Sequence, residues 1–479
     1  MGSSYRERVL ASLMWLGGTQ LVGQVVSWAS TVLVIRLLAP GDYGLMAMAT
    51  LFVAFAQMLS EFGIGAAIIQ AEDLTDEDLP AIQAFILLFN GLAFVLTLTL
   101  SPLIAAFFEE PRLVDVLRVL SVTFLLVGIY VLPQSRLMRE LDFSRKARVD
   151  FASTVTAALV TLACAWFGLG VWALVVGNLT NHGLRAIGFN WILRGVVLPR
   201  WSTRRGRRFL DFGSVVVLDR LLWFLYQNLD ITIAGKVLGA QALGLYSVAL
   251  QLAAIPLDKV LPVITQVALP AVSRIQSEPA RVAANMLRAL RYGNQLFLPV
   301  FWGMALVAPD AIPFLLGDPW LGAVLPFQLV CVILPMKAVG ALLPPALFGL
   351  GRPGVNVANM LISLVLLGGG FAVGVQRGLE GLAAAWAVVY PVVFLITTTR
   401  ALPVIGLRWR DLLSAWFPAI VSALVMSAAV LGVQWLTSDW PEPIRLVAAI
   451  AAGAGAYVLC LIMLDRDAIR DLRSLRSGA

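Results

Sequence analysis

Charged residues are scarce in this chain. They make up 13% of its 479 residues, whereas 60% of the residues are hydrophobic. A soluble globular protein carries about 25% charged and about 45–50% apolar residues. No fold of this length can hide so much apolar surface from water, because a folded chain always leaves part of its surface accessible. The composition therefore excludes a soluble protein and predicts an integral membrane protein.

Long hydrophilic segments are also missing. No stretch between the apolar blocks is long enough for a soluble catalytic domain, and the sequence contains no G-x-x-x-x-G-K-[ST] motif. These absences exclude a nucleotide-binding domain of the P-loop type. We expect any transport by this chain to draw on an ion gradient, the membrane potential or the substrate gradient.

Cysteine and histidine are rare. Cys164, Cys331 and Cys460 all lie in apolar blocks, which favours inert packing over a disulfide or a metal site. His182 is the only histidine, and a packed or hydrogen-bonded imidazole is favoured over a proton relay. The sequence therefore predicts no metal centre and no cofactor.

Apolar blocks of helix length are abundant. A spanning helix needs about 20 predominantly apolar residues. The chain contains fourteen such blocks, at residues 11–36, 44–70, 82–108, 114–135, 149–168, 171–193, 209–235, 240–270, 285–308, 320–347, 355–375, 380–400, 412–436 and 444–464. Only Gly168-Leu169-Gly170 separates the fifth block from the sixth, and prolines interrupt the eighth. We predict an all-α integral membrane protein with about 14 transmembrane helices.

Basic residues set the expected orientation. An even number of spans places both termini on one side, and most loop lysines and arginines fall there, as in 135–148, 193–208 and 465–479. The positive-inside rule makes this side cytoplasmic, although the loop 71–80 on the same side is acidic. The first block is too long for a signal-peptide core, so we interpret it as an uncleaved signal-anchor.

A turn between apolar blocks occurs twice. RLLAPGDYGLMAMA (36–49) returns as KVLGAQALGLYSVA (236–249), an interval of 200 residues. Two weaker matches, 132–137 with 343–348 and 170–177 with 381–388, share an offset of 211. Gly44 and Gly244 have no side chain, so we expect each to let its helix start close against a partner. Arg36 and Lys236 are interpreted as interfacial anchors.

The repeats predict the domain organisation. Residues 1–200 form an N-lobe with helices 1–6, residues 201–405 form a C-lobe with helices 7–12, and residues 406–479 add a helix pair and a cytoplasmic tail. Because each repeat has an even number of spans, both lobes insert with one orientation and are related by a pseudo-twofold axis along the membrane normal. Two such pseudo-symmetric six-helix lobes enclose a central cleft, which is typical of transporters that work by alternating access.

Polar side chains recur at helical spacing inside several apolar blocks. The sets are Gln20 with Gln24; Gln57 with Glu61; Asn178, Asn181, His182 and Arg185; Asp219, Trp223, Gln227 and Asp230, with Arg220 at the border; and Gln251, Asp258, Lys259 and Gln266. Ionisable groups at membrane depth are costly and mark transport pathways. Amide side chains also serve as hydrogen bonds between helices, so both interpretations stay open.

Three segments carry a resemblance to a known family. RLLAPGDYGLMAMATLFVAFAQMLSEFGIGAAIIQ (36–70) resembles the opening of the polysaccharide-transport branch of the MOP flippase superfamily, the Wzx-type proteins. LYQNLDITIAGKVLGAQALGLYSVALQL (225–252) with IPLDKVLPVITQVALPAVSRIQ (255–276) resembles the start of the second lobe of that family. QSRLMRELDFSRKARVDF (134–151) resembles the loop between its fourth and fifth helices.

The resemblance implies a cargo. It is an undecaprenyl-pyrophosphate-linked oligosaccharide repeat unit, moved from the inner to the outer leaflet of the bacterial inner membrane for O-antigen, capsule or exopolysaccharide assembly. Such a cargo requires cations for the pyrophosphate and aromatic or polar groups for the sugars. The substrate-binding candidates are Arg220, Lys259, Lys337, Arg185, Trp223, Tyr226, Gln227, Gln24, Gln57, Glu61 and Trp302.

Acidic and amide residues at membrane depth raise a second possibility, a coupling cation, either H+ or Na+. The candidates are Asp230, Asn228, Asn356, Asn359, Asp219 and Asp258. Polysaccharide polymerases and glycosyltransferases of the same pathway are the protein partners that the family suggests, and no nucleic acid is expected.

Two alternatives remain. A MATE-like cation-coupled drug or metabolite antiporter would usually have twelve helices, so the additional pair at 406–479 argues against it. A membrane glycosyltransferase or polysaccharide polymerase needs a large catalytic loop, whereas the longest outer loop, 309–320, is short and largely apolar. We therefore expect a transporter and not an enzyme.

Overall fold

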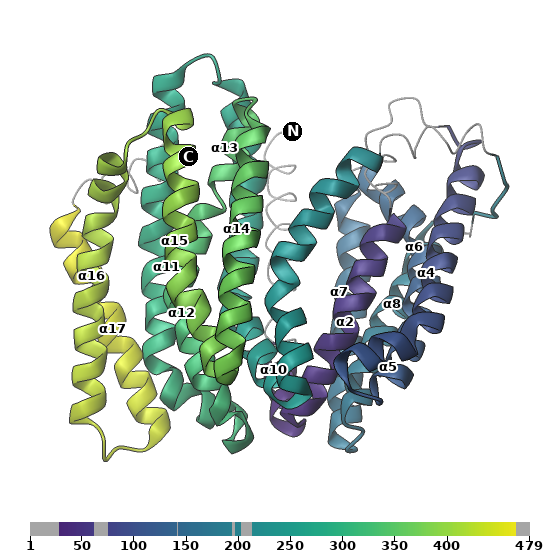
Figure 1. Cartoon of the computed structure of the whole chain (residues 1–479), viewed down its shortest axis with the longest axis horizontal. Helices are drawn as coiled ribbons and strands as arrows, with labels where there is room; N and C mark the ends of the chain where they lie inside the picture. Colours follow the sequence, from purple (N-terminus) through teal and green to yellow (C-terminus); the bar gives the residue numbers. More distant parts are fainter. Residues whose placement is uncertain (1–27, 62–74, 141, 194–196, 203–212, 466–479) are drawn as a thin grey trace, which may run out of the picture. The chain divides into compact units, whose positions relative to one another are not determined.

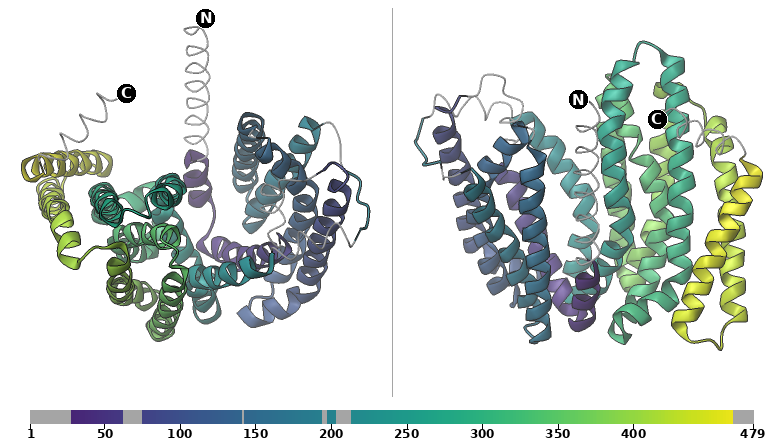
Figure 2. Two further views of the ribbon diagram at one scale, coloured as in Figure 1. Left: turned by 90° about the horizontal axis from the view of Figure 1, so that it is seen from above. Right: turned by 180° about the vertical axis from the view of Figure 1, so that it is seen from behind.

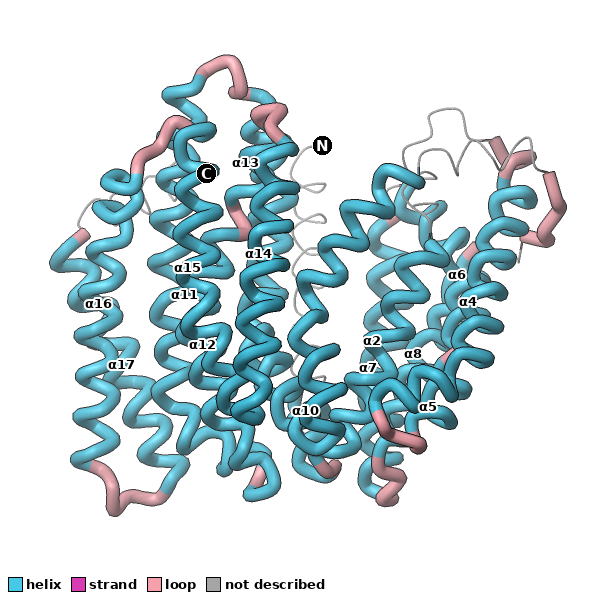
Figure 3. The backbone as a smooth tube through the Cα atoms, in the orientation of Figure 1, coloured by secondary structure: helices cyan, strands magenta, loops and turns pink. Residues whose placement is uncertain are grey.

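The computed structural model describes residues 28–61, 75–140, 142–193, 197–202 and 213–465. Within these ranges every regular element is a helix (Figure 3). The prediction of an all-α chain is therefore confirmed for the part of the chain that the structure describes.

The chain divides into two compact units, here called unit 1 and unit 2. Unit 1 comprises Met1–Phe224 with Gly235–Gly244, and unit 2 comprises Leu225–Ala234 with Leu245–Ala479. The helices of unit 1 (Figure 1) are α2 (Pro40–Glu61), α4 (Leu79–Phe108), α5 (Leu113–Leu120), α6 (Val122–Arg139), α7 (Phe143–Trp166) and α8 (Val171–Ile192).

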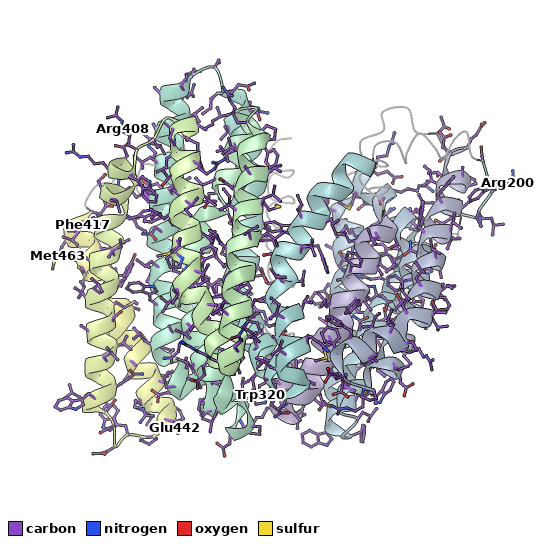
Figure 4. All side chains as sticks on the ribbon, viewed as in Figure 1. Arg200, Trp320, Arg408, Phe417, Glu442 and Met463 are labelled. Carbon is purple, nitrogen blue, oxygen red and sulfur yellow. The ribbon has the colours of Figure 1, made fainter. Side chains whose placement is uncertain are left out.

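The helix α10 (Gly213–Arg274) is shared between the units, and the helices after it belong to unit 2. These are α11 (Pro279–Leu316), η1 (Asp318–Ala323), α12 (Val324–Gly340), α13 (Leu343–Gly349), α14 (Pro353–Gly374), η2 (Val375–Arg377), α15 (Gly378–Ile405), α16 (Trp409–Leu436) and α17 (Glu442–Leu464). The fully buried Trp320 of η1 lies at the foot of this unit (Figure 4).

Ten helical segments in the described ranges are long and apolar enough to cross a membrane. Two of them, Leu221–Pro262 and Pro353–Ile405, each overlap two predicted blocks, so the ten segments coincide at least in part with twelve of the fourteen. The first block, 11–36, falls mainly outside the described residues, and only the short apolar helix Trp28–Leu37 represents it. The observed fold is that of an all-helical membrane protein with ten candidate spans among the described residues.

The helix α8 corresponds to the predicted block 171–193 but is not one of the ten candidate spans. It carries Asn178, Asn181, His182 and Arg185, and these polar side chains lower its hydropathy. The short link to α7 has Gly168 at φ +74° and Gly170 at φ +57°, in the left-handed region that favours glycine. The two glycines thus make the tight turn that the sequence suggests.

The predicted seventh and eighth blocks meet in a sharp break of α10. The backbone of Gly239 has φ 76° and ψ −178°, which is not helical, and space is open around its Cα. This break lies within KVLGAQALGLYSVA, where the sequence predicts a turn. We call the helical stretches before and after Gly239 the first and second arms of α10. The residues around the break, Gly235–Gly244, belong to unit 1, whereas Leu225–Ala234 on the first arm and the second arm from Leu245 onward belong to unit 2.

The two repeated turns contact each other through their backbones inside unit 1. A Cβ atom at Gly44 would overlap the carbonyl group of Ala240, and one at Gly244 would overlap the carbonyl group of Pro40. Pro40 and Ala240 occupy equivalent positions of the repeat, as do Gly44 and Gly244. Exchanging the copies therefore exchanges the two contacts, which is the property of a local twofold axis. The close approach expected at both glycines is found, with each turn as the partner of the other.

Polar contacts hold both turns in place. The carboxylate of Asp42 accepts the backbone N–H of Val171 at 3.1 Å, at the start of α8. Lys236 Nζ lies 2.8 Å from Glu109 Oε1 and 5.5 Å from the centroid of the Phe107 ring. The hydrogen bond from Lys236, and then its charge, hold the pKa of Glu109 below its usual value. Lys236 thus anchors its helix end to the link between α4 and α5.

The helix pair α16–α17 packs on α11, and α16 and α17 run side by side in all views (Figure 2). Only 17% of the residues in the most apolar stretch of α17 are buried. Phe417 and Met463 are exposed and point outward (Figure 4). Ion pairs tie the pair to α11: Arg291 with Asp465, and Arg445 with Asp310 at 2.6 Å. Residues 291 and 310 lie about 28 Å apart along a helix, close to the hydrocarbon thickness of about 30 Å.

We predict that Gly44→Ala destabilises the protein. The added Cβ meets a backbone carbonyl that cannot turn away, and overpacking of this kind costs about 1–3 kcal/mol. The measurement is the thermal unfolding midpoint in detergent. Gly91→Ala in α4 is the matched control because its Cβ would meet no atom within 4 Å. Equal midpoints for the two variants would contradict the backbone contact.

Candidate functional site

Asp230 is the most deeply buried carboxylate within a candidate span of unit 2. Only 2% of the residue is exposed. Its Oδ2 accepts the hydroxyl of Tyr246 at 2.7 Å, and its Oδ1 accepts the backbone N–H of Ile231 at 2.9 Å. The break at Gly239 makes this pairing possible, because it returns the second arm of α10 alongside the first.

Two further helices complete the surroundings of Asp230. The indole N–H of Trp386, from α15, donates to the hydroxyl of Tyr246 at 2.7 Å. The ammonium of Lys337, in the last turn of α12, lies 4.3 Å from the centroid of the Trp386 ring. Lys337 also interacts electrostatically with Asp230 and Asp258. We call Asp230, Tyr246, Trp386 and Lys337 the buried cluster.

Aromatic rings surround the buried cluster. Tyr226 and Tyr390 share a hydrogen bond through their hydroxyls. Trp386 lies 5.8 Å from Tyr390 and 5.0 Å from Phe371 between ring centroids. This apolar wall lowers the local dielectric constant and thereby strengthens every charge interaction in the cluster.

A polar face of α10 lies near this cluster. Gln251, Asp258 and Lys259 recur at helical spacing on the second arm, and all three side chains are exposed. Gln227 is exposed on the first arm. All four belong to the candidate span Leu221–Pro262. Exposed ionisable groups at membrane depth require water or a polar ligand, because hydrocarbon cannot solvate them.

Asn359 in α14 has its amide fully engaged. Its nitrogen donates to the carbonyl of Thr397 at 3.1 Å, and its oxygen accepts Nε of Arg400 at 3.0 Å. Asn356, one turn earlier, is half-buried. Asn228 is half-buried as well, and its backbone carbonyl accepts the hydroxyl of Thr232, as in an ordinary helix turn. Of the predicted amide ligands of a coupling cation, Asn359 therefore already has its side chain engaged in contacts with α15.

Unit 1 has its own polar group on α7 and α8. The carboxylate of Asp150 lies 2.7 Å from Lys146 Nζ and 2.9 Å from Arg185 Nη2. His182 Nδ1 and the hydroxyl of Tyr130 are hydrogen-bonded at 3.1 Å. The favoured interpretation of His182 as a hydrogen-bonded imidazole is confirmed. Arg185, predicted to bind phosphate, is paired with a carboxylate of the chain.

The other predicted substrate-binding residues have different surroundings. Trp223 is 51% exposed, and Gln57 is half-buried. The indole of Trp302 donates to the carbonyl of Val332 at 3.3 Å, so it links α11 to α12. Gln24 lies outside the described residues, and of Glu61, Asp219 and Arg220 only the helical backbone is described.

The sequence analysis missed three residues of this region: Tyr246, Trp386 and Arg400. One signal for Tyr246 was present, because position 46 of the first repeat is Met, so a hydroxyl replaces an apolar side chain there. Trp386 and Arg400 lie in blocks whose helical faces give no indication of the partner helix. Only the fold brings Trp386 to a residue 140 positions away in the sequence.

Residues 33–325, more than half of the chain, match the family described as "Polysaccharide biosynthesis protein". The chain belongs to this polysaccharide biosynthesis family. It is 28% identical over 419 residues to the teichuronic acid biosynthesis protein TuaB of Bacillus subtilis, and the alignment covers 85% of this chain and 86% of TuaB. It is 24% identical over 439 residues to the lipopolysaccharide biosynthesis protein WzxC of Escherichia coli, and the alignment covers 89% of this chain and 88% of WzxC.

A solved structure shows the same fold. The lipid II flippase MurJ in an inward closed conformation superimposes with a TM-score of 0.75 over 95% of this chain and 100% of MurJ, at 12% identity. The expected membership of the polysaccharide biosynthesis family is thus confirmed by the family match, and the fold is the one seen in MurJ. The chain is a multi-pass membrane protein of this polysaccharide biosynthesis family.

We predict that Tyr246→Phe weakens both stability and transport. The change removes the donor to a buried carboxylate, and a hydrogen bond to a charged group contributes about 1.5–3 kcal/mol. The readouts are the unfolding midpoint and polysaccharide export in a complemented deletion strain. Tyr457→Phe is the matched control, because its hydroxyl donates to a neutral backbone carbonyl of Gln295. A wild-type midpoint and full export in Tyr246→Phe would contradict the assignment.

Proposed function

We propose that this chain is a flippase for undecaprenyl-pyrophosphate-linked oligosaccharide repeat units. It moves them from the inner to the outer leaflet of the bacterial inner membrane by alternating access, for O-antigen, capsule or exopolysaccharide assembly. The observation that carries the proposal is the set of cationic and polar side chains inside candidate spans of unit 2, next to aromatic rings. The family membership supports a role in the same biosynthesis.

The chemistry of the cargo matches these residues. Its pyrophosphate needs cations, and Lys337 and the exposed Lys259 supply two within unit 2. Its sugars need flat apolar faces with polar edges, which tyrosine and tryptophan provide. Trp223 and Tyr226 lie on α10 next to the polar Gln227, and Gln227 would bind hydroxyl groups. Arg220 and Arg185 are the proposed cations of unit 1.

The proposed architecture has fourteen spans, with lobes at 1–200 and 201–405 and the additional helix pair at 406–479. Both termini lie in the cytoplasm. The repeated turns support a duplication of this kind, since the backbone contact at Gly44 and Gly244 is symmetric under exchange of the repeats. The helix pair α16–α17 supports the third segment, because it packs on α11 as one body.

Deletion of the gene in its native host tests the function. We expect one lipid-linked repeat unit to accumulate on the cytoplasmic face, because synthesis continues while translocation stops. The measurement is mass spectrometry of the lipid fraction. A glycosidase added to inside-out vesicles reaches only the cytoplasmic leaflet, so digestion of the repeat unit assigns it to that leaflet. Loss of the repeat unit itself, or glycosyl transfer by the purified protein, would instead indicate an enzyme. Altered resistance to small cations with normal polysaccharide would indicate a drug antiporter.

Two substitutions test the cation assignment in the same strain. We expect Arg220→Ala and Lys259→Ala each to reduce export about tenfold or more, because each removes a charge-assisted contact to the pyrophosphate worth about 1.5–3 kcal/mol. Export is measured as surface polysaccharide at matched protein level. The control is Arg352→Ala, an exposed cation in the loop before α14. Full export in both test variants would remove these residues from the site.

A further inference from the structure

Asp230 requires a positive charge close by. A carboxylate at membrane depth with 2% exposure loses nearly all of its hydration, and that loss costs several kcal/mol unless another charge and hydrogen bonds compensate it. In an ion-coupled transporter, a bound metal cation could supply that charge. The donor set around the carboxylate shows whether this site suits a metal ion.

The groups around Asp230 are hydrogen-bond donors. Tyr246 gives its hydroxyl proton to Oδ2 at 2.7 Å and accepts the indole N–H of Trp386 at 2.7 Å. Ile231 gives its backbone N–H to Oδ1. A hard cation such as Na+ needs several oxygen atoms whose lone pairs point at it. Tyr246 directs a proton at the carboxylate instead, so these partners favour a bare carboxylate and repel a metal ion.

The chain brings its own cation to this place. Lys337 projects from the last turn of α12, where the helix dipole favours a positive charge. Its ammonium lies over the face of Trp386, 4.3 Å from the centroid, and Trp386 is linked through Tyr246 to Asp230. Lys337 interacts electrostatically with both Asp230 and Asp258. An ammonium held in this way adds a positive charge to the surroundings of Asp230 through Trp386 and Tyr246.

Asn359 on α14 is a second predicted cation ligand that already has a cationic side chain as its partner. Its side-chain oxygen, the atom that would ligate a cation, accepts Nε of Arg400 at 3.0 Å. Its nitrogen is held by the carbonyl of Thr397, so the amide cannot turn without losing that contact. Two predicted ligand groups of unit 2 thus each have a cationic side chain of the chain as partner.

We propose that Lys337 is the tethered counter-ion of Asp230 and stands in the place of a coupling metal ion. The proposal argues against sodium as the coupling ion, because Asp230 and Asn359 then serve internal cations. The consequence for transport rests on the proposed flippase function: the pyrophosphate of the cargo competes with Asp230 for Lys337. Binding of an anionic cargo is thereby connected to the charge state of the buried cluster.

Thermal unfolding of the purified full-length protein tests the proposal without any transport assay. In the wild type, replacing choline chloride by NaCl at constant ionic strength should leave the midpoint unchanged. Lys337→Met should lower the midpoint by about 5 °C or more, because it leaves Asp230 without its counter-ion. Adding Asp230→Asn to Lys337→Met should restore most of that loss, since the uncompensated charge is gone.

The controls separate this pairing from general damage. Asp258→Asn in the Lys337→Met background should give no rescue, because Asp258 is exposed and keeps its hydration. Lys337→Arg keeps the charge and should stay close to wild type if Lys337→Met does not fold. A saturable rise of the wild-type midpoint with NaCl that Asp230→Asn abolishes would overturn the proposal. The proposal would also be overturned if the midpoint of the double variant Lys337→Met with Asp230→Asn fell by the sum of the losses in the two single variants. Neither result depends on the deletion experiment, so the two proposals can fail separately.

Discussion

A charge inside the hydrocarbon must find its counter-charge within the chain, and the helix contacts of this protein follow from that constraint. Lipid tails are as apolar as leucine side chains, so the hydrophobic effect does not decide which helices associate in a bilayer. Asp150 with Arg185 joins α7 to α8, Asp310 with Arg445 joins α11 to α17, and Trp386 with Tyr246 joins α15 to α10. The two ion pairs are half-buried, so removal of one partner leaves a partly desolvated charge without compensation. These polar contacts specify which helices pair, and the apolar residues contribute the van der Waals packing between them.

The spans could be predicted from the sequence because hydropathy is a local property. Any run of about 20 apolar residues satisfies its own backbone as a helix, so twelve predicted blocks appear in the candidate spans of the described residues. The exception, α8, shows the limit of this reasoning. Its polar residues lower its hydropathy, yet Asn178 and His182 find partners on α6 and the helix forms. Hydropathy cannot anticipate a partner that the fold supplies.

The contacts of the site could be predicted only in part. Helical spacing places Asp230 on a polar face of α10, and the break in KVLGAQALG indicates that the chain turns back there. Together these made Asp230 a candidate. Its partners were beyond reach, because the spacing on one helix gives a direction and not the identity of the helix in that direction. Trp386 and Lys337 come from α15 and α12, in blocks where the spacing of polar residues does not indicate α10 as the partner. For the same reason Asp230 was assigned to a cation and Lys337 to the cargo, although the two interact.

The pairing of cations with internal carboxylates bears on selectivity in the proposed function. Arg185 faces Asp150 in unit 1, and Lys337 interacts with Asp230 in unit 2. A ligand with a single negative charge gains little by displacing such a carboxylate, because it offers the cation the same charge and leaves the carboxylate unpaired. A pyrophosphate offers more charge and several acceptor oxygens at once, so it can compensate both the cation and the cost of leaving a carboxylate behind. Under the proposed function, internal pairing would therefore disfavour chloride and simple carboxylates and favour a multiply charged headgroup. A cavity lined by unpaired cations would bind all of these anions, whereas paired cations discriminate by the number of charges that the ligand carries.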